Sequence, residues 1–141
     1  MTRPAESLRS SAAALPPVLA DWFAGQGWTP HPHQLELLAA DDDTLLIAPT
    51  GGGKTLAGFL PTLADLAAGD HQGLHTLYVS PLKALTHDIA RNLSRPVADL
   101  GLKIRIEDRT GDTGAARRAR QRVDPPQILL TTPESLALML S

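Results

Sequence analysis

The residues best suited to chemistry lie in one glycine-rich segment, Ala48-Pro49-Thr50-Gly51-Gly52-Gly53-Lys54-Thr55. Glycines permit positive φ angles and let backbone N–H groups approach phosphate oxygens without a Cβ in the way. Lys54 can place a point charge on the β and γ phosphates of a nucleotide, and the hydroxyl of Thr55 can bind Mg²⁺. The segment therefore predicts a phosphate loop that binds ATP together with Mg²⁺.

The flanks of this segment supply the setting that a phosphate loop needs. Leu45-Leu46-Ile47 before it predicts a strand, and Leu56-Ala57-Gly58-Phe59-Leu60 after it predicts a helix. Backbone donors at a helix N-terminus attract an anion. Ala48 departs from the usual pattern, which begins with glycine, but the flanks, glycines, lysine and threonine agree. The alternative is a glycine-rich turn with a solvated lysine.

Three polar turns come later in the chain, each just past an apolar run. They are Ser80-Pro81-Leu82-Lys83-Ala84-Leu85, Arg109-Thr110-Gly111-Asp112-Thr113 and Thr131-Thr132-Pro133-Glu134-Ser135. If the runs are parallel strands, the turns follow their carboxyl ends, where ligands bind in open sheets. Small hydroxyl residues and backbone N–H groups at a helix start suit phosphates rather than bases. Taken singly, each is an ordinary helix-capping turn, with Ser80, Thr113 and Thr132 as the expected N-caps.

The elements that must position these turns alternate along the chain. Apolar runs at 44–48, 76–80, 102–107 and 127–131 are separated by helix-like stretches at 54–68, 82–100 and 113–122, and helices are also expected at 16–23 and 32–40. This alternation predicts an α/β fold with a mostly parallel sheet covered by helices on both faces. The run at 102–107 alternates apolar and charged residues and should lie toward the sheet edge, whereas the other three runs should be buried.

Composition places the chain among globular proteins. Its 141 residues are 43% hydrophobic and 20% charged, enough for one domain with a real core. Cysteine is absent, no apolar run approaches the length of a membrane span, and the expected location is the cytoplasm. Residues 1–15 are expected to be a flexible leader and residues 16–141 the domain.

Positive charge gathers in one part of the sequence, although the net charge is −2. Seven of the thirteen basic residues fall within residues 103–122, which hold three acids; they are Lys103, Arg105, Arg109, Arg117, Arg118, Arg120 and Arg122. Either this is a solvated basic helix face, or it is an electrostatic footprint for nucleic-acid phosphates. Charge alone leaves both open.

The phosphate loop and the three turns, in this order, resemble the first motor domain of superfamily-two DEAD/DEAH-type helicases. That domain is RecA-like, and its motifs Ia, Ib and Ic correspond to the three turns. The amino-acid sequences of the three turns are most similar to those of the Lhr (large helicase-related) group. Within that group they are most similar to the bacterial ligase-associated DExH-box helicases implicated in DNA damage response. The resemblance extends from about Trp22 to the last residue.

The resemblance implies roles for particular residues. It places the nucleotide at Gln34, Thr50, Gly51, Gly52, Gly53, Lys54 and Thr55, with Gln34 on the adenine edge and Thr55 on Mg²⁺. It places one strand of DNA, or of RNA, along Ser80, Pro81, Lys83, Thr110, Gly111, Thr132 and Pro133. A glutamine amide can both donate to adenine and accept from it. From the residues alone, a surface glutamine on a helix is an equal alternative for Gln34, and Phe23 or Trp28 could cover the base.

The resemblance further implies an ATP-dependent DNA helicase or translocase, linked to DNA repair and associated with a DNA ligase. Such an enzyme needs a strand ending in an Asp-Glu pair and a second motor domain. The sequence contains no D-E-x-H or D-E-A-D string. The 141 residues are therefore expected to be an incomplete first motor domain that hydrolyses ATP poorly. A non-catalytic module for single-stranded nucleic acid and an unrelated phosphate-loop kinase or ATPase are the alternatives.

Overall fold

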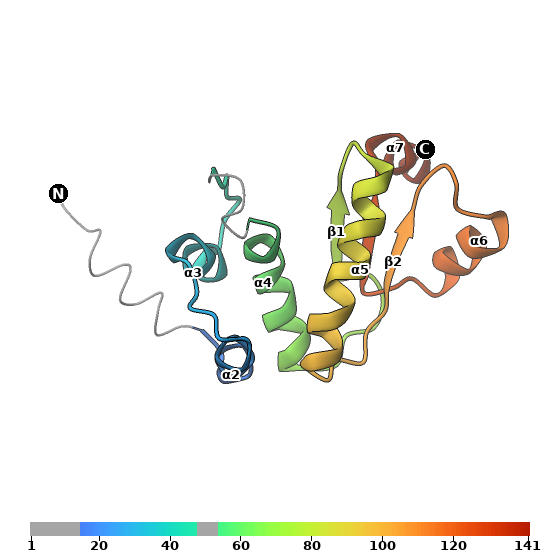
Figure 1. Cartoon of the computed structure of the whole chain (residues 1–141). Helices are drawn as coiled ribbons and strands as arrows, with labels where there is room; N and C mark the ends of the chain where they lie inside the picture. Colours follow the sequence, from blue (N-terminus) through green and yellow to red (C-terminus); the bar gives the residue numbers. More distant parts are fainter. Residues whose placement is uncertain (1–14, 48–53) are drawn as a thin grey trace. The chain divides into compact units, whose positions relative to one another are not determined.

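The computed structural model describes residues 15–47 and 54–141 of the chain (Figure 1). The chain divides into two compact units, Met1–Gly69 and Asp70–Ser141, and each is described by itself. Residues 1–14 of the expected leader and the phosphate-loop residues 48–53, including Thr50, Gly51, Gly52 and Gly53, lie outside the described residues.

The described residues of the first unit form three helices: α2 (Pro17–Gln26), α3 (Pro32–Ala39) and α4 (Lys54–Ala68). The two prolines stand at the first position of α2 and α3, where the missing N–H costs no hydrogen bond. Gly27 ends α2 at a φ of 73°, a left-handed conformation that glycine adopts without strain. The helices follow the predicted ranges closely.

The apolar run before the phosphate loop differs from expectation. Residues 44–47 form no strand in the described part of the chain, and the side chains of Leu45 and Ile47 are 84% and 85% exposed. An apolar run becomes a strand only when a neighbouring strand pairs with its backbone, and within the described residues no strand pairs with residues 44–47. The predicted strand at these residues is therefore wrong for this structure.

The second unit contains a parallel sheet. Its strands are β1 (Thr76–Val79), β2 (Ile106–Arg109) and β3 (Ile128–Thr131), in the order β1-β3-β2, with both pairings parallel. The helices α5 (Lys83–Asp99), α6 (Ala115–Val123) and α7 (Pro133–Leu140) follow these strands one by one (Figure 1). The α/β alternation with parallel strands is as predicted.

Burial along the strands agrees with the prediction only in part. The central strand β3 is buried at all four residues, and β2 lies at an edge as expected. The prediction that β1 is a buried central strand is wrong, because Leu77 and Val79 are 40% and 41% exposed. In the described residues β1 pairs on one side only, so its other edge has no neighbouring strand.

The strand β2 also begins later than predicted, at Ile106 instead of Leu102. The reason is the end of α5, where Gly101 takes a φ of 66° and donates to the carbonyl of Ala98 at 3.0 Å. Leu102 then donates to the carbonyl of Val97 at 3.0 Å, so that its backbone caps the helix.

A helix that crosses a bilayer needs about 20 predominantly apolar residues. Within residues 15–47 and 54–141, no helix combines the length and the apolar character needed to cross a membrane.

Candidate functional site

The strand register places the three polar turns at one rim of the sheet. Thr131 of β3 is the register partner of both Val79 of β1 and Arg109 of β2, and each of these is the last residue of its strand. Ser80, Thr110 and Thr132 therefore follow the strands at the same level. The prediction that these turns share a rim is confirmed, whereas Thr50 lies outside the described residues.

The turn after β1 places one exposed cation at this rim. Ser80 is buried, donates its N–H to the carbonyl of Thr131 at 3.0 Å, and accepts through Oγ from the N–H of Leu82 at 3.4 Å. The N-cap of α5 is Leu82, so the expected N-cap role of Ser80 is wrong, because Pro81 and Leu82 both stand between it and the first helical residue, Lys83. Pro81 and Lys83 are exposed.

Hydrogen bonds close the turn after β2 upon itself. The hydroxyl of Thr113 accepts from the N–H of Thr110 at 3.0 Å, and the hydroxyl of Thr110 accepts from the N–H of Asp112 at 3.2 Å. Thr113 is consequently not the N-cap of α6; that position belongs to Gly114. Gly111, at the tip of the turn, is exposed.

Arg118 holds this turn from the side of α6. Its Nη2 donates to the carbonyl oxygens of Thr110 at 3.2 Å and of Gly111 at 3.1 Å. A guanidinium makes charge-assisted hydrogen bonds, which are stronger than neutral ones. Sequence reasoning missed this positioning role, because nothing in the spacing shows which arginine reaches back eight residues.

The turn after β3 behaves as predicted. Thr132 is the N-cap of α7, and its hydroxyl accepts from the N–H of Ser135 at 3.4 Å. Pro133 takes the first helical position and is exposed. Beneath them, the hydroxyl of Thr131 donates to the carbonyl of Arg109 at 2.6 Å and ties β3 to β2.

The rim thus separates two kinds of residue. The hydroxyls of Ser80, Thr110 and Thr132 are buried and engaged within their own turns. Of the residues predicted to line the nucleic-acid path, Pro81, Lys83, Gly111 and Pro133 are exposed, and the carboxylate of Asp112 is exposed beside them. A ligand arriving at this edge therefore meets the ion pair of Lys83 and Asp112, while the buried hydroxyls hold the turns in shape.

In the first unit, Gln34 lies beside a hollow lined by aromatic residues. The cavity measures about 470 Å³ and is bordered by Phe23, Gly27, Trp28, Thr29, His31, Gln34 and Leu56. The rings of Phe23 and Trp28 are 6.1 Å apart and nearly perpendicular, and Trp28 is half exposed. A cavity with aromatic walls and one amide matches the chemistry that holds a nucleobase.

Two further features of the first unit bear on nucleotide binding. Gln34 is buried, and its Oε1 accepts from the N–H of His31 at 2.8 Å in a capping box at the start of α3. Lys54 and Thr55 open α4 and are both exposed. Their side chains are thus accessible at a helix N-terminus, where an anion is favoured.

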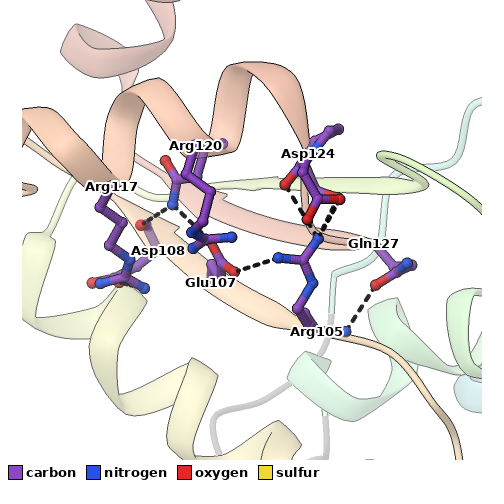
Figure 2. Close-up of polar contacts among 9 residues, drawn as sticks. Arg105, Glu107, Asp108, Arg117, Arg120, Asp124 and Gln127 are labelled. Carbon is purple, nitrogen blue, oxygen red and sulfur yellow. Dashed lines mark hydrogen bonds and ion pairs between the residues drawn. The ribbon is translucent and has the colours of Figure 1, made fainter.

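The basic residues between 103 and 122 form neither a wholly solvated helix face nor a wholly free surface for nucleic-acid phosphates. Arg120 donates to Glu107 at 2.7 Å, Arg117 pairs with Asp108 at 3.1 Å, and Arg105 pairs with Glu107 at 3.4 Å (Figure 2). Arg105 also pairs with Asp124 at 2.9 Å. These arginines bind the chain's own acids, so they form neither a fully solvated face nor an uncompensated nucleic-acid footprint.

Glu107 is the centre of this network. Burial alone raises the pKa of its carboxyl. Hydrogen bonds from Arg120 and Gln121 and the charges of Arg120 and Arg105 outweigh burial, so the pKa of Glu107 lies below its usual value. Glu107 is therefore ionised in the folded chain at neutral pH.

The sequence matches a known family over most of its length. Residues 32–141 match the DEAD/DEAH box helicase family. The chain belongs to this family. The Lhr helicase/probable uracil glycosylase of Mycolicibacterium smegmatis is 44% identical over 137 residues, which cover 86% of this chain and 9% of that protein.

Other relatives agree with this assignment. The Lhr helicase/uracil glycosylase of Escherichia coli is 39% identical over 147 residues, covering 89% of this chain and 10% of that protein. Among solved structures, Mycobacterium smegmatis helicase Lhr bound to ssDNA and AMP-PNP matches with a TM-score of 0.83 and 38% identity, over 92% of this chain and 18% of that chain. The predicted Lhr-like, RecA-like α/β assignment is confirmed. The chain spans about a tenth of the length of these two curated relatives.

Proposed function

We propose that this chain is the ATP-binding part of the first motor domain of an ATP-dependent DNA helicase or translocase of the Lhr-like group. The observation that carries the proposal is the shared rim, where turns after three parallel strands end at the same register level. A motor that moves along nucleic acid needs a continuous edge for the backbone of one strand. Membership of the DEAD/DEAH box helicase family supports the second part of the proposal, which is that the chain binds ATP.

In this proposal the adenine base occupies the hollow beside Gln34. Phe23 and Trp28 provide the aromatic surface, and the amide of Gln34 provides the polar contact to the base. Lys54 contacts the β and γ phosphates, and Thr55 contributes its hydroxyl to Mg²⁺. Thr50, Gly51, Gly52 and Gly53 complete the phosphate cradle; for these four residues the proposal rests on the sequence pattern.

Single-stranded DNA, or RNA, runs along the rim. Lys83 contributes charge, and the exposed residues Gly111 and Pro133 lie beside the path of the phosphates. Ser80, Thr110 and Thr132 shape the turns, with Pro81 and Pro133 exposed beside them. Because these groups read phosphates and not bases, binding is indifferent to sequence.

The proposal also covers ATP hydrolysis by the whole protein, its role and its location. The whole protein hydrolyses ATP with the help of an Asp-Glu pair and a second motor domain, and residues 1–141 alone hydrolyse ATP poorly. A role in DNA repair and an association with a DNA ligase are expected from the resemblance to ligase-associated helicases. The cytoplasm, where such motors meet ATP and their strands, is the expected location.

The decisive experiment tests the proposed ATP site by calorimetry with ATP and Mg²⁺. Lys54→Ala removes the charge that faces the phosphates and should weaken ATP binding roughly ten- to a hundredfold, about 1.5–3 kcal/mol. Lys103→Ala, which removes an exposed lysine from the second unit, is the matched control and should bind ATP like wild type. Equal ATP affinity in wild type and Lys54→Ala would refute the phosphate-loop assignment.

A further inference from the structure

We propose that Asp112 is an internal competitor for the nucleic-acid strand: its carboxylate holds the ammonium of Lys83, and a strand phosphate must displace it. The inference rests on the proposed nucleic-acid path and adds to it a residue that sets the affinity for the strand. Asp112 belongs to the turn after β2, whereas Lys83 opens α5 after β1.

The contact joins two turns of the rim. Lys83 Nζ lies 3.3 Å from Asp112 Oδ2, although the residues are 29 positions apart in the sequence. Both side chains are open to solvent, with 58% of Lys83 and 80% of Asp112 exposed. An incoming phosphate can therefore reach the lysine, but it meets a carboxylate already placed against the same ammonium.

The backbone of Asp112 is held in place. Its N–H donates to the hydroxyl of Thr110 at 3.2 Å, and Thr113 donates its N–H to the carbonyl of Thr110 at 3.2 Å. Arg118 donates to the carbonyls of Thr110 and Gly111 at 3.2 and 3.1 Å. Because the turn is fixed by these bonds, the carboxylate of Asp112 stays near the rim and does not swing away with a flexible loop.

A carboxylate and a phosphate make the same demand on Lys83. Both are oxygen anions that accept charge-assisted hydrogen bonds from an ammonium group. Binding of a strand therefore exchanges one anion for another at Lys83 and leaves the charge of Asp112 close to the strand. Exposed pairs of this kind are weak, so the competition should change affinity about two- to fivefold.

The ion pair of Lys83 and Asp112 disfavours the binding of single anions at the rim. A lone anion gains little by replacing Asp112, because one ion pair is exchanged for another. A strand gains several phosphate contacts at once, at Gly111 and the start of α7 as well as at Lys83, and these offset the lost internal pair. Asp112 thus favours a strand of several nucleotides over isolated phosphates.

The test is an NMR titration of the 15 kDa chain. Amide ¹H–¹⁵N shifts are followed as single-stranded oligothymidylate is added, up to millimolar concentration and at low salt. The variants are Asp112→Asn, Lys83→Ala and the double variant. Asp99→Asn is the matched control, because it removes the same charge at the far end of α5, about 24 Å away along the helix.

Asp112→Asn should bind oligothymidylate about two- to fivefold more tightly than wild type, and Asp99→Asn should bind like wild type. In the Lys83→Ala background the Asp112→Asn gain should shrink, because no ammonium is left to compete for. The gain should also fade at about 1 M salt, where the Debye length is about 3 Å. Circular dichroism of each variant confirms that the fold is retained.

Two different failures can be told apart. If Lys83→Ala weakens binding but Asp112→Asn binds like wild type or more weakly, the competitor role is wrong and the nucleic-acid path stands. If Asp112→Asn and Asp99→Asn strengthen binding equally, only net charge is at work and the competitor role is again wrong. If the wild-type rim shows no shifts at millimolar strand, or if Lys83→Ala binds like wild type, the proposed path itself is refuted.

Discussion

Arg120 donates from Nη2 to Oε1 of Glu107 at 2.7 Å, and this contact joins α6 to β2 (Figure 2). Glu107 is only 8% exposed, so most of its acceptor capacity is directed to its own chain. The helix held by this contact carries Arg118, which binds the carbonyls of the turn after β2. A buried carboxylate thus helps to set the geometry of the rim.

Replacing this carboxylate should destabilise the second unit. Glu107→Ala removes the acceptor of Arg120, Gln121 and Arg105, and we expect the free energy of unfolding to fall by about 1.5–3 kcal/mol. Urea unfolding followed by circular dichroism measures the change. Glu36→Ala, an exposed residue of α3, is the control and should stay within about 0.5 kcal/mol of wild type. Equal stability of both variants would contradict the role of the network.

The same carboxylate predicts a pH dependence. The folded-state pKa of Glu107 lies below its usual value, so the unfolded chain binds this proton more readily than the folded chain. The stabilisation is present above the unfolded pKa of about 4.3 and is lost as pH falls through the folded pKa. Urea unfolding between neutral and acid pH should therefore show a shallower loss of stability in Glu107→Gln than in wild type. If the free energy of unfolding fell equally steeply with pH in both proteins, the prediction would be contradicted.

Features fixed by local sequence were predictable. The bounds of α4, Lys54–Ala68, coincide with the predicted helix, because the apolar spacing after the glycines is local information. The shared rim was also predictable, since parallel strands place their following turns at one edge. Thr132 followed the N-cap rule, because the proline that follows it can occupy the first helical position without losing a hydrogen bond.

Features that depend on tertiary partners were not predictable. Leu45 and Leu77 belong to apolar runs typical of buried strands, yet both are exposed in this structure. Burial depends on which other segment of the chain covers a run. Arg117 and Arg120 appeared as a charge run, and only the fold shows that acids of β2 neutralise them. Likewise, the contact between Lys83 and Asp112 joins residues that no short motif connects.

The N-cap at the rim offers a separate test of stability. Thr132→Ala removes the hydroxyl that accepts from the N–H of Ser135, and we expect a loss of about 1 kcal/mol. Thr132→Ser keeps the acceptor and should lie close to wild type. Urea unfolding of the three proteins makes the comparison. A loss of the same size in both variants would show that the methyl group, and not the cap, is responsible.

The last prediction separates two roles of Gln34. Its Oε1 accepts from the N–H of His31 at 2.8 Å, which stabilises the start of α3, and its amide is also the proposed contact to adenine. Gln34→Glu keeps an acceptor for His31 but loses the N–H donor and adds a negative charge. We therefore expect the cap of α3 to be retained, with some loss of stability from the buried charge, together with roughly five- to thirtyfold weaker ATP binding, about 1–2 kcal/mol.

Gln34→Ala completes the comparison, because it removes both the cap and the base contact. It should lose about 0.5–1 kcal/mol of stability as well as ATP affinity, and it should discriminate less between ATP and GTP. Calorimetry with each nucleotide and urea unfolding measure the two effects on the same proteins. If Gln34→Glu binds ATP as tightly as wild type, the residue acts only as the cap of α3, and the hollow beside Gln34 is not the adenine site.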